Sequence, residues 1–217
     1  MNYSKKDGGR ILMIRIDNLQ TYGFESAMRG MRNPMNSWDK NDTHINVIGE
    51  NDLKLLQQLT RAGSDHRKVL RQMMISCDIT APLYWWKEFD TYKVGVTTNS
   101  QSTMHKLCSR PLTIHDFSFE DMHENEFIVN VVLDNLNTRI KDYKEGMKQN
   151  KGLWRTIIQL LPCSYNQTRT VTMNYENVMN MYRQRRHHKL SEWQEFCAYM
   201  YDNLAYFDRL QEAAPMV

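Results

Sequence analysis

Residues 81–105 read APLYWWKEFDTYKVGVTTNSQSTMH, and the rest of the chain is organised around this stretch. Its first half predicts a short aromatic helix, because Thr80 can cap it, Pro82 suits the first turn and Gly95 can end it. Its second half, residues 97–103, is a run of hydroxyl and amide side chains without an apolar period. Such a run cannot fill a core, so we interpret it either as a solvated loop or as a surface for a polar ligand.

The composition is that of a folded chain whose overall charge is nearly balanced. It has 217 residues, 41% hydrophobic and 11% aromatic, which suffices for one domain that we predict to span residues 1–217. The 28 basic and 25 acidic residues give no overall field that would favour DNA or a membrane surface. No apolar run reaches the roughly 18 residues of a membrane span, and none resembles a signal peptide.

The cysteines are spread along the chain and form no Cys-x-x-Cys pair. This spacing suits neither a zinc site nor a disulfide framework, so we expect reduced thiols in a cytoplasmic protein and no metal. We also expect none of them to be a nucleophile, because no cation or histidine stands beside a cysteine in the sequence to activate it. The residues concerned are Cys77, Cys108, Cys163 and Cys197.

Apolar periodicity predicts an α/β fold. Alternating or β-branched runs predict strands over residues 10–17, 73–76 and 168–173. Helical spacing predicts helices over residues 23–31, 51–62, 127–143, 153–161, 174–182 and 191–207. In these helices Arg29 and Arg32 are interpreted as surface charge, Asn174 as a helix cap, and the aromatic stripe from Trp193 to Phe207 as core or subunit contact.

Thr97, Asn99 and Ser102 follow the aromatic helix in the pattern Thr-x-Asn-x-x-Ser, which resembles the signature of the flavin-dependent thymidylate synthases (ThyX). The segment Gly63-Ser-Asp-His66 is similar to the family's Gly-His turn. Leu161-Pro162, a strand that ends at Asn174, then Asn180 and Arg185 resemble its carboxy-terminal plan. The resemblance implies a ThyX-like fold, an antiparallel sheet packed with long helices.

The chain departs from that signature at four places. Residues 91–93 are Thr-Tyr-Lys where the family has Arg-His-Arg, and Met104 stands where it has an arginine for the nucleotide. Arg71 falls where the family has an acid, and Glu176 replaces an arginine near the adenine side of FAD. Because arginine donates in a bidentate manner that other residues do not reproduce, these changes indicate a divergent branch, such as those that phages or prophages carry.

The resemblance implies the reductive methylation of dUMP to dTMP. Methylenetetrahydrofolate would give the carbon, reduced FAD the hydride, and NADPH would reduce the flavin again. The residues that it implies for the nucleotide are Lys93, Asn99, Gln101, Ser102 and Arg185. Those that it implies for the flavin are His66, Thr91, Tyr92, Lys93, Asn174 and Asn180. The family also builds its site at the interfaces of a homotetramer, for which the 193–207 stripe or a helix over 126–143 would supply contacts.

Two alternatives to this function stay open from the sequence. The changed signature would also suit a related flavin or nucleotide-binding protein with another pyrimidine substrate or with no activity. The basic run over residues 183–189, RQRRHHK, would suit a non-enzymatic module for nucleic acid, although such a run is more often a solvated helix face or helix end.

Overall fold

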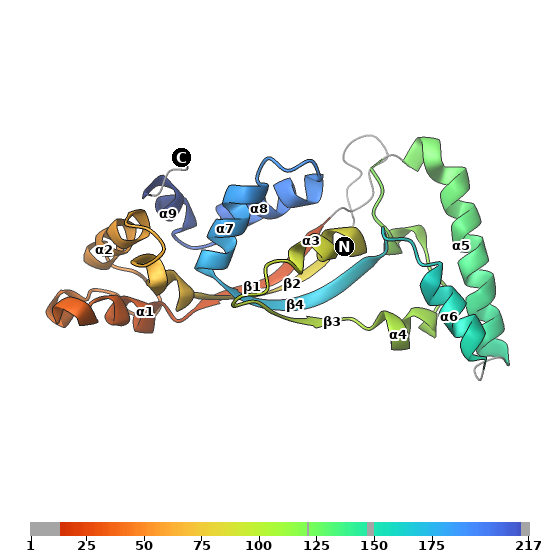
Figure 1. Cartoon of the computed structure of the whole chain (residues 1–217), viewed down its shortest axis with the longest axis horizontal. Helices are drawn as coiled ribbons and strands as arrows, with labels where there is room; N and C mark the ends of the chain where they lie inside the picture. Colours follow the sequence, from red (N-terminus) through yellow and green to blue (C-terminus); the bar gives the residue numbers. More distant parts are fainter. Residues whose placement is uncertain (1–13, 121, 147–149, 214–217) are drawn as a thin grey trace. The chain divides into compact units, whose positions relative to one another are not determined.

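A computed structural model describes residues 14–120, 122–146 and 150–213, apart from the side chains of residues 122–124 (Figure 1). Four strands form one antiparallel sheet in the order β1-β2-β4-β3, and nine α-helices accompany it in this described part of the chain. The α/β prediction is therefore confirmed. No helix within these ranges is long and apolar enough to cross a bilayer.

The strands are β1 (Arg15–Tyr22), β2 (Met74–Pro82), β3 (Thr97–Ser100) and β4 (Asn166–Asn174). The helices are α1 (Phe24–Met31), α2 (Glu50–Arg61), α3 (Leu83–Phe89), α4 (Thr103–Lys106), α5 (Met122–Glu145), α6 (Lys151–Gln159), α7 (Tyr175–Arg185), α8 (Ser191–Asn203) and α9 (Phe207–Ala213). Short 3-10 turns lie between them, among them η1 (Asn33–Met35) and η3 (Arg67–Arg71).

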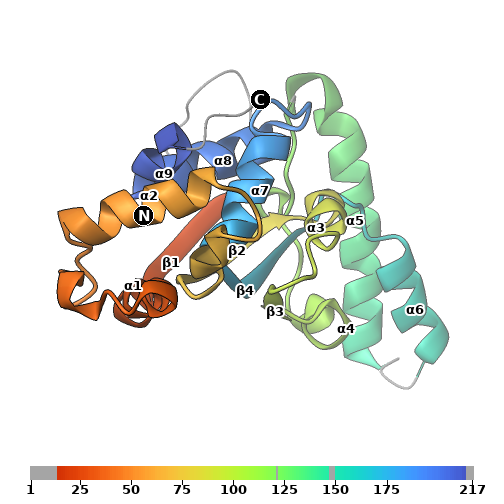
Figure 2. The same ribbon diagram turned by 60° about the vertical axis from the view of Figure 1, so that its left-hand side comes forward.

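The chain groups into two compact units. Unit 1 takes residues 79–90 and 99–169, together with the start of β1, and unit 2 takes residues 16–78, 91–98 and 170 onwards. In unit 1, α5 lies beside α6, as both views show (Figures 1 and 2). In unit 2, α2 packs against α9 and η3, while α7 packs against η3 and α8.

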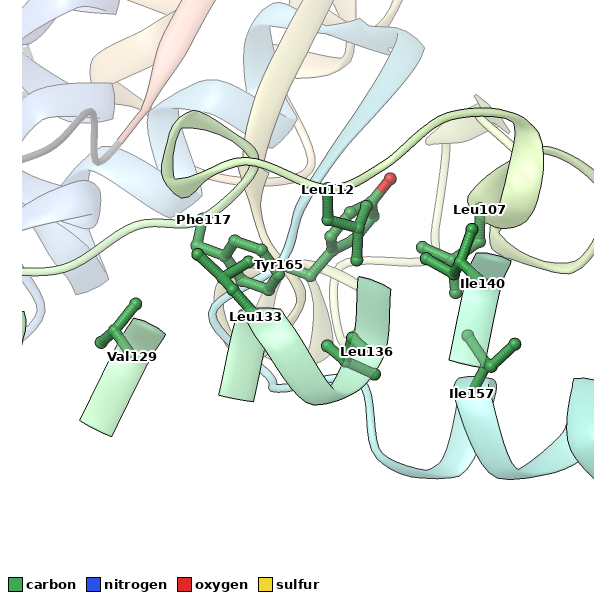
Figure 3. Packing of buried hydrophobic residues seen from close by; sticks show 9 residues of the cluster. All are labelled: Leu107, Leu112, Phe117, Val129, Leu133, Leu136, Ile140, Ile157 and Tyr165. Carbon is green, nitrogen blue, oxygen red and sulfur yellow. The ribbon is translucent and has the colours of Figure 1, made fainter. Parts of the chain in front are cut away.

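The core of unit 1 forms between α5, α6 and the loops beside them. Four side chains of α5 lie three, four or seven residues apart and so share one face of the helix. This face confirms the long helix that the apolar spacing predicts. Figure 3 shows the cluster, which consists of Leu107, Leu112, Phe117, Val129, Leu133, Leu136, Ile140, Ile157 and Tyr165.

The core of unit 2 takes up the aromatic stripe of the carboxy-terminal helices. Trp193, Phe196 and Met200 on α8 have no exposed surface, and Phe207 on α9 is equally buried. The stripe is therefore core within its own chain. It is carried by two helices, not by the single helix predicted over 191–207, because Leu204 has an extended backbone and ends α8.

Two of the observed strands differ from the sequence prediction. β1 covers residues 15–22, later than the predicted 10–17, of which residues 10–13 lie outside the described part. Asn18 has a positive φ of 54° in this strand and donates from Nδ2 to Asp78 Oδ2 at 2.7 Å. Part of the polar run over 97–103 forms β3 at the edge of the sheet, where backbone pairing stabilises a strand without apolar burial.

Helix ends also differ in two places. α3 ends at Phe89, before Gly95, and Gly95 supplies a φ of 75° in the turn that follows. The sequence Ser191-Glu-Trp-Gln194 also predicts a capping box, but α8 has Leu190 at its N-cap and makes no side-chain cap hydrogen bond. By contrast, Asn174 caps α7 as predicted: its Oδ1 accepts from Asn177 N at 2.9 Å, and Asn177 Oδ1 accepts from Asn174 N at 3.1 Å.

Candidate functional site

One polar face of α7 lies against η3 in unit 2. The residues of this face are Glu176, Asn180 and Arg183, which are separated by four and three positions and therefore lie one above the other on the helix. The capping box at Asn174 fixes where α7 begins, so it also fixes the register of this face. α7 and η3 are packed against each other, which brings the face to the side chains of residues 64–71.

Glu176 holds two arginines of η3. Arg67 Nε donates to Glu176 Oε1 at 3.0 Å, and Arg71 Nε donates to the other carboxylate oxygen, Oε2. Arg67 also reaches Asn180, with 3.5 Å between Nη2 and Oδ1. Only 12% of the Glu176 side chain is exposed, so the carboxylate is enclosed by its two partners. We call Arg67, Arg71, Glu176, Asn180 and Arg183 the arginine cluster.

Electrostatics within the arginine cluster favour the charged form of Glu176. Burial tends to raise the pKa of Glu176, but hydrogen bonds and positive charge from Arg71 and Arg67 outweigh it and hold that pKa below its ordinary value. The pKa of Arg183 is lowered by burial and by the positive charge of Arg67. Two guanidinium groups, those of Arg67 and Arg71, thus share one enclosed carboxylate, and the exposed Asp65 also acts on Arg71.

The two departures from the family signature at residues 71 and 176 contact each other. The signature has an acid where this chain has Arg71 and an arginine where it has Glu176, so the chain carries the two charges in exchanged positions. In this chain the two opposite charges face each other, and their contact is direct. Sequence reasoning found both changes but not the pairing, because the residues are 105 positions apart.

A pocket of about 880 Å³ lies beside His66 in unit 2. Its walls are the segment from Gly30 to Lys40, one face of α2 and the turn from Asp65 to Gln72. His66, the residue predicted to touch the flavin, is exposed in this wall. Each wall also contributes one lysine, and these are Lys40, Lys54 and Lys68. Apolar side chains of α2 and η3 complete the lining, and Asp65 adds one acid to it.

A buried ion pair fixes the wall of this pocket. Asp52 on α2 has no exposed side-chain surface and accepts from Arg32 Nε at 2.6 Å. It also accepts from Asn41 Nδ2 at 2.9 Å, Asp42 N at 3.1 Å and Thr43 Oγ1 at 2.6 Å. The carboxylate therefore ties the loop after η1 to α2. The interpretation of Arg32 as surface charge is wrong, since only 4% of it is exposed, whereas Arg29 is exposed as predicted.

The sequence also predicts that Asn51-Asp52 caps the helix over 51–62, but a residue of that loop caps the amino-terminal end of α2. Asp42 accepts from the backbone N–H groups of Asn51 at 2.9 Å and Asp52 at 3.0 Å. These bonds keep the pKa of Asp42 below its ordinary value against the opposing effect of burial. Gly49 leaves the space for this cap, because a Cβ there would lie 2.2 Å from Asp42 Cγ.

Tyr92 and Arg185 come together in unit 2. Arg185 Nε donates to the Tyr92 hydroxyl at 2.9 Å, and that hydroxyl donates to Gln184 Oε1 at 2.8 Å. The guanidinium also lies 5.2 Å from the ring centre of Trp193, a residue that the sequence analysis assigned to core or subunit contact. The segment around Tyr92 is further tied to α7 by Asn177 Nδ2, which donates to Val94 O at 2.7 Å. Arg185 thus lies beside two aromatic rings that also contact each other.

The polar residues predicted for the nucleotide around β3 belong to unit 1. Gln101 N donates to Thr168 O at 2.8 Å, and Gln101 O accepts from Gln167 Nε2 at 2.7 Å. Ser102 Oγ accepts from His105 N at 3.1 Å and so caps α4. Arg169 extends this network, since its Nε donates to Gln167 Oε1 at 3.0 Å.

Arg169 is a cation that sequence reasoning missed. It pairs with Asp90 at 2.7 Å and stacks on Trp86, with its Cζ 4.2 Å from the ring centre. The only signal was the strand alternation, which places residue 169 on the same face as the buried Val171 and Met173. The remaining predicted residues, Thr91, Lys93 and Asn99, have exposed side chains.

The cysteines are all free thiols. Burial raises the pKa of Cys77 and of Cys197 to about 12, and it raises that of Cys108 as well, so these three remain protonated at neutral pH. Cys163 is exposed, and folding brings Lys87 Nζ to 3.9 Å from its sulfur. Within the described residues, no three histidine, cysteine or acidic side chains are placed to hold a metal ion.

Comparison with known proteins gives a match by structure alone. No family model and no curated protein matches the sequence. Two crystal structures of thymidylate synthase X (ThyX) from Helicobacter pylori with FAD and dUMP superpose with TM-scores of 0.76 and 0.73 at 14% identity, covering 94% of this chain and all of theirs. A UMP/dUMP methylase, PolB from Streptomyces cacaoi bound with 5-Br dUMP, gives 0.65 at 14% identity and covers 94% and 95%. The chain therefore has the fold of the flavin-dependent thymidylate synthases.

Proposed function

We propose that this protein is a flavin-dependent enzyme that methylates the pyrimidine of dUMP. The observation that carries the proposal is the direct contact between Arg71 and Glu176. Both residues depart from the family signature, and their charges are exchanged relative to it. Two unrelated changes would have no reason to be complementary, whereas a retained site with exchanged partners explains both. The shared fold with proteins crystallised with FAD and dUMP supports the same conclusion.

The residues of unit 2 fit a flavin dinucleotide chemically. Arginines, an amide and a histidine on η3 and α7 are of the kind that hold phosphate groups and ring carbonyls. When bound, reduced FAD would supply the hydride for methylation, with carbon from methylenetetrahydrofolate and NADPH as the reductant. His66, Thr91, Tyr92, Lys93, Asn174 and Asn180 would hold the flavin. Asn174 would act through the backbone of α7, because its own side chain is used in the cap.

In unit 2 the nucleotide would be held by Lys93 and Arg185, and the assignment of Asn99, Gln101 and Ser102 of unit 1 to the nucleotide stays a prediction from the resemblance. The stacking of Arg185 against Tyr92 and Trp193 fixes its guanidinium plane, which reduces the entropy lost when it binds a phosphate or a uracil oxygen. The pocket beside His66 would take the third reactant, since methylenetetrahydrofolate and NADPH both combine flat rings with negative charge. Its three lysines would face the charged part of that molecule.

The enzyme would be a cytoplasmic homo-oligomer, and we infer a tetramer. Support comes from α5, where Phe127, Ile128 and Val131 are 79%, 62% and 43% exposed although they are apolar. An apolar face of this kind marks an interaction surface more often than a solvated one. The aromatic stripe of α8 and α9 is enclosed within unit 2, so α5 is the better candidate for contact between subunits.

Nucleic-acid binding through residues 183–189 has less support. The three arginines of this run are half-buried, and each makes contacts within unit 2. Arg185 stacks on Tyr92 and Trp193, Arg186 lies over the ring of Tyr182 at 5.8 Å, and Arg183 lies near enough to Arg67 to be influenced by its charge. A module that neutralises a phosphate backbone needs its arginines directed outward.

The test begins with the absorption spectrum of the purified protein and with calorimetric titration of dUMP. We expect a flavin spectrum and dUMP binding that Arg185→Ala weakens by about tenfold to a few hundredfold, because a charge-assisted hydrogen bond is worth roughly 1.5–3 kcal/mol. Ser102→Ala should weaken it less. Arg185→Lys keeps the charge, and Arg110→Ala removes an arginine that pairs with Asp116 in unit 1 as a matched control. Wild-type protein that binds neither flavin nor dUMP would refute the proposal.

A further inference from the structure

We infer that the pocket beside His66 recognises the polyglutamate tail of a folate through Lys40, Lys54 and Lys68. The inference rests on the proposed function, which supplies methylenetetrahydrofolate as the carbon donor. It deepens that function because it separates folate from NADPH and names the part of the folate that is recognised. Such a tail gains one negative charge with each added glutamate. None of the three lysines is among the residues that carry the family resemblance.

The first step of the argument is the placement of the three lysines. Lys40 ends the segment that begins at Gly30, Lys54 lies on α2 and Lys68 lies on η3, so each wall of the pocket brings one positive charge. All three side chains are exposed. Within the described ranges of the chain, none of their ammonium groups has a hydrogen bond or an ion pair. The pocket is therefore surrounded by cations that are available to a ligand.

The second step is the charge balance of the lining. Arg32 adds no net charge, because the buried Asp52 accepts from its Nε at 2.6 Å. Asp65 is the one acid among the lining residues, and its charge also acts on Arg71, which does not line the pocket. Three lysines against one aspartate leave an excess of two positive charges. The pocket therefore favours an anion that carries several charges.

The third step distinguishes a chain of carboxylates from a diphosphate. Proteins commonly hold a diphosphate with free backbone N–H groups at a helix N-terminus or with bidentate arginines. The pocket reaches the first turn of α2 at Asn51, but Asp42 already accepts from the N–H groups of Asn51 and Asp52, at 2.9 and 3.0 Å. The carboxylate of Asp42 would also repel a phosphate. Arg32, the arginine of the lining, is 4% exposed and is held by Asp52.

What remains for an anion is a set of ammonium groups on separate walls. Lysine acts as a point charge on a flexible stem, so three of them suit carboxylates that are spaced along a chain. The phosphates of NADPH concentrate their charge in fewer places and would need the donors that Asp42 and Asp52 occupy. Of the two reactants that the proposed function leaves for this pocket, a folate with a glutamate tail is therefore the better match.

The fourth step is the room for the rest of the folate. Leu55 and Leu59 lie four positions apart, so they share one face of α2, and both line the pocket together with Val69 of η3. These apolar side chains can cover the ring system while the lysines contact the tail. The volume of about 880 Å³ is near the upper end of the roughly 300–1,000 Å³ of small-molecule pockets.

The experiment compares folates that differ only in the length of the tail. Tetrahydrofolate monoglutamate, tetrahydrofolate pentaglutamate and NADPH are titrated by anaerobic calorimetry against full-length wild type, Lys40→Gln, Lys54→Gln, Lys68→Gln and the triple variant. Each titration is run at about 0.05 M and about 0.5 M sodium chloride. Lys151→Gln removes an exposed lysine from α6 in unit 1 and is the matched control. Circular dichroism and thermal melting check that every variant folds.

We expect wild type to bind the pentaglutamate about fivefold to a hundredfold more tightly than the monoglutamate at the lower salt, because each exposed ion pair gives a gain of up to about fivefold and the tail makes several. The higher salt should reduce this preference. Each single variant should lose part of it, and the triple variant should bind the two folates within about twofold of each other. Lys151→Gln should keep the full preference.

Three results would overturn the inference. They are a wild type that binds neither folate or binds both equally, a preference for the pentaglutamate that persists in the triple variant, and NADPH binding that depends on the lysines as strongly as pentaglutamate binding does. Failure of the proposed function gives a different result. Wild type that binds dUMP and flavin without a preference for the longer tail removes only the inference, whereas a lysine-dependent preference in a protein that binds no dUMP removes only the dUMP enzyme.

Discussion

Asp52→Ala should destabilise the protein severely, because it removes the counter-ion of a buried arginine. In the folded chain Asp52 has no exposed surface and accepts four hydrogen bonds of 2.6–3.1 Å, and Arg32 is 4% exposed. The alanine variant leaves the Arg32 guanidinium buried without its carboxylate. Breaking a buried pair by removing one partner costs roughly 3–5 kcal/mol. For a chain of this length that corresponds to a fall in Tm of about 6–20 °C.

The assay is thermal and urea unfolding of wild type and three variants. Asp52→Asn keeps the shape and one acceptor oxygen, so its loss of stability should fall between wild type and Asp52→Ala. Asp39→Ala removes an exposed carboxylate from the same loop and should change the free energy of unfolding by less than about 0.5 kcal/mol. If Asp52→Ala costs less than about 1 kcal/mol, the reasoning that this ion pair anchors the pocket wall is refuted.

Three further perturbations address other features. Gly49→Ala should cost about 1–2 kcal/mol or more in urea unfolding, because its Cβ would displace the Asp42 cap, whereas Gly146→Ala, with nothing within 4 Å, should be neutral. The pKa of Glu176 is lowered in the folded protein, so the stabilisation from its ion pairs is present above its unfolded pKa near 4.5 and is lost as the pH falls through the folded value. The difference in unfolding free energy between wild type and Glu176→Gln should therefore shrink from pH 6 to pH 3. Phe127→Asp should lower the mass seen by light scattering, and a tetramer that is unaffected would exclude the α5 face.

Local patterns predicted the elements that local interactions determine. The long helix α5 and the buried stripe of α8 and α9 follow from apolar spacing, and the cap of α7 follows from an asparagine placed just before a helix. β3 was missed because an edge strand made of polar residues carries no apolar signal. It forms a strand because its backbone pairs with β4, whose residues lie about 70 positions further along the chain.

The candidate site was predicted as a set of residues but not as a set of contacts. Arg32 and Arg29 cannot be told apart by local sequence, yet only Arg32 is buried. Its guanidinium pairs with Asp52, which lies 20 positions later in the chain. Tyr92 and Arg185 were both named, and their contact over 93 positions was not. The charge of each side chain can be read from the sequence. The partner of each charge, however, depends on the packing of η3 against α7 and of the loop after η1 against α2.

The exchanged pair at residues 71 and 176 bears on how such a chain diverges and how it is found. In this chain, reversing the charge of either residue alone leaves like charges in contact, so the effects of the two positions on stability are coupled. A series of substitutions that avoids like charges in contact passes through an uncharged residue at one of the two positions. Profile searches score positions one at a time and penalise both changes fully, although together they leave the local electrostatics balanced. Compensated pairs therefore remove a chain from the reach of sequence comparison faster than they alter its fold.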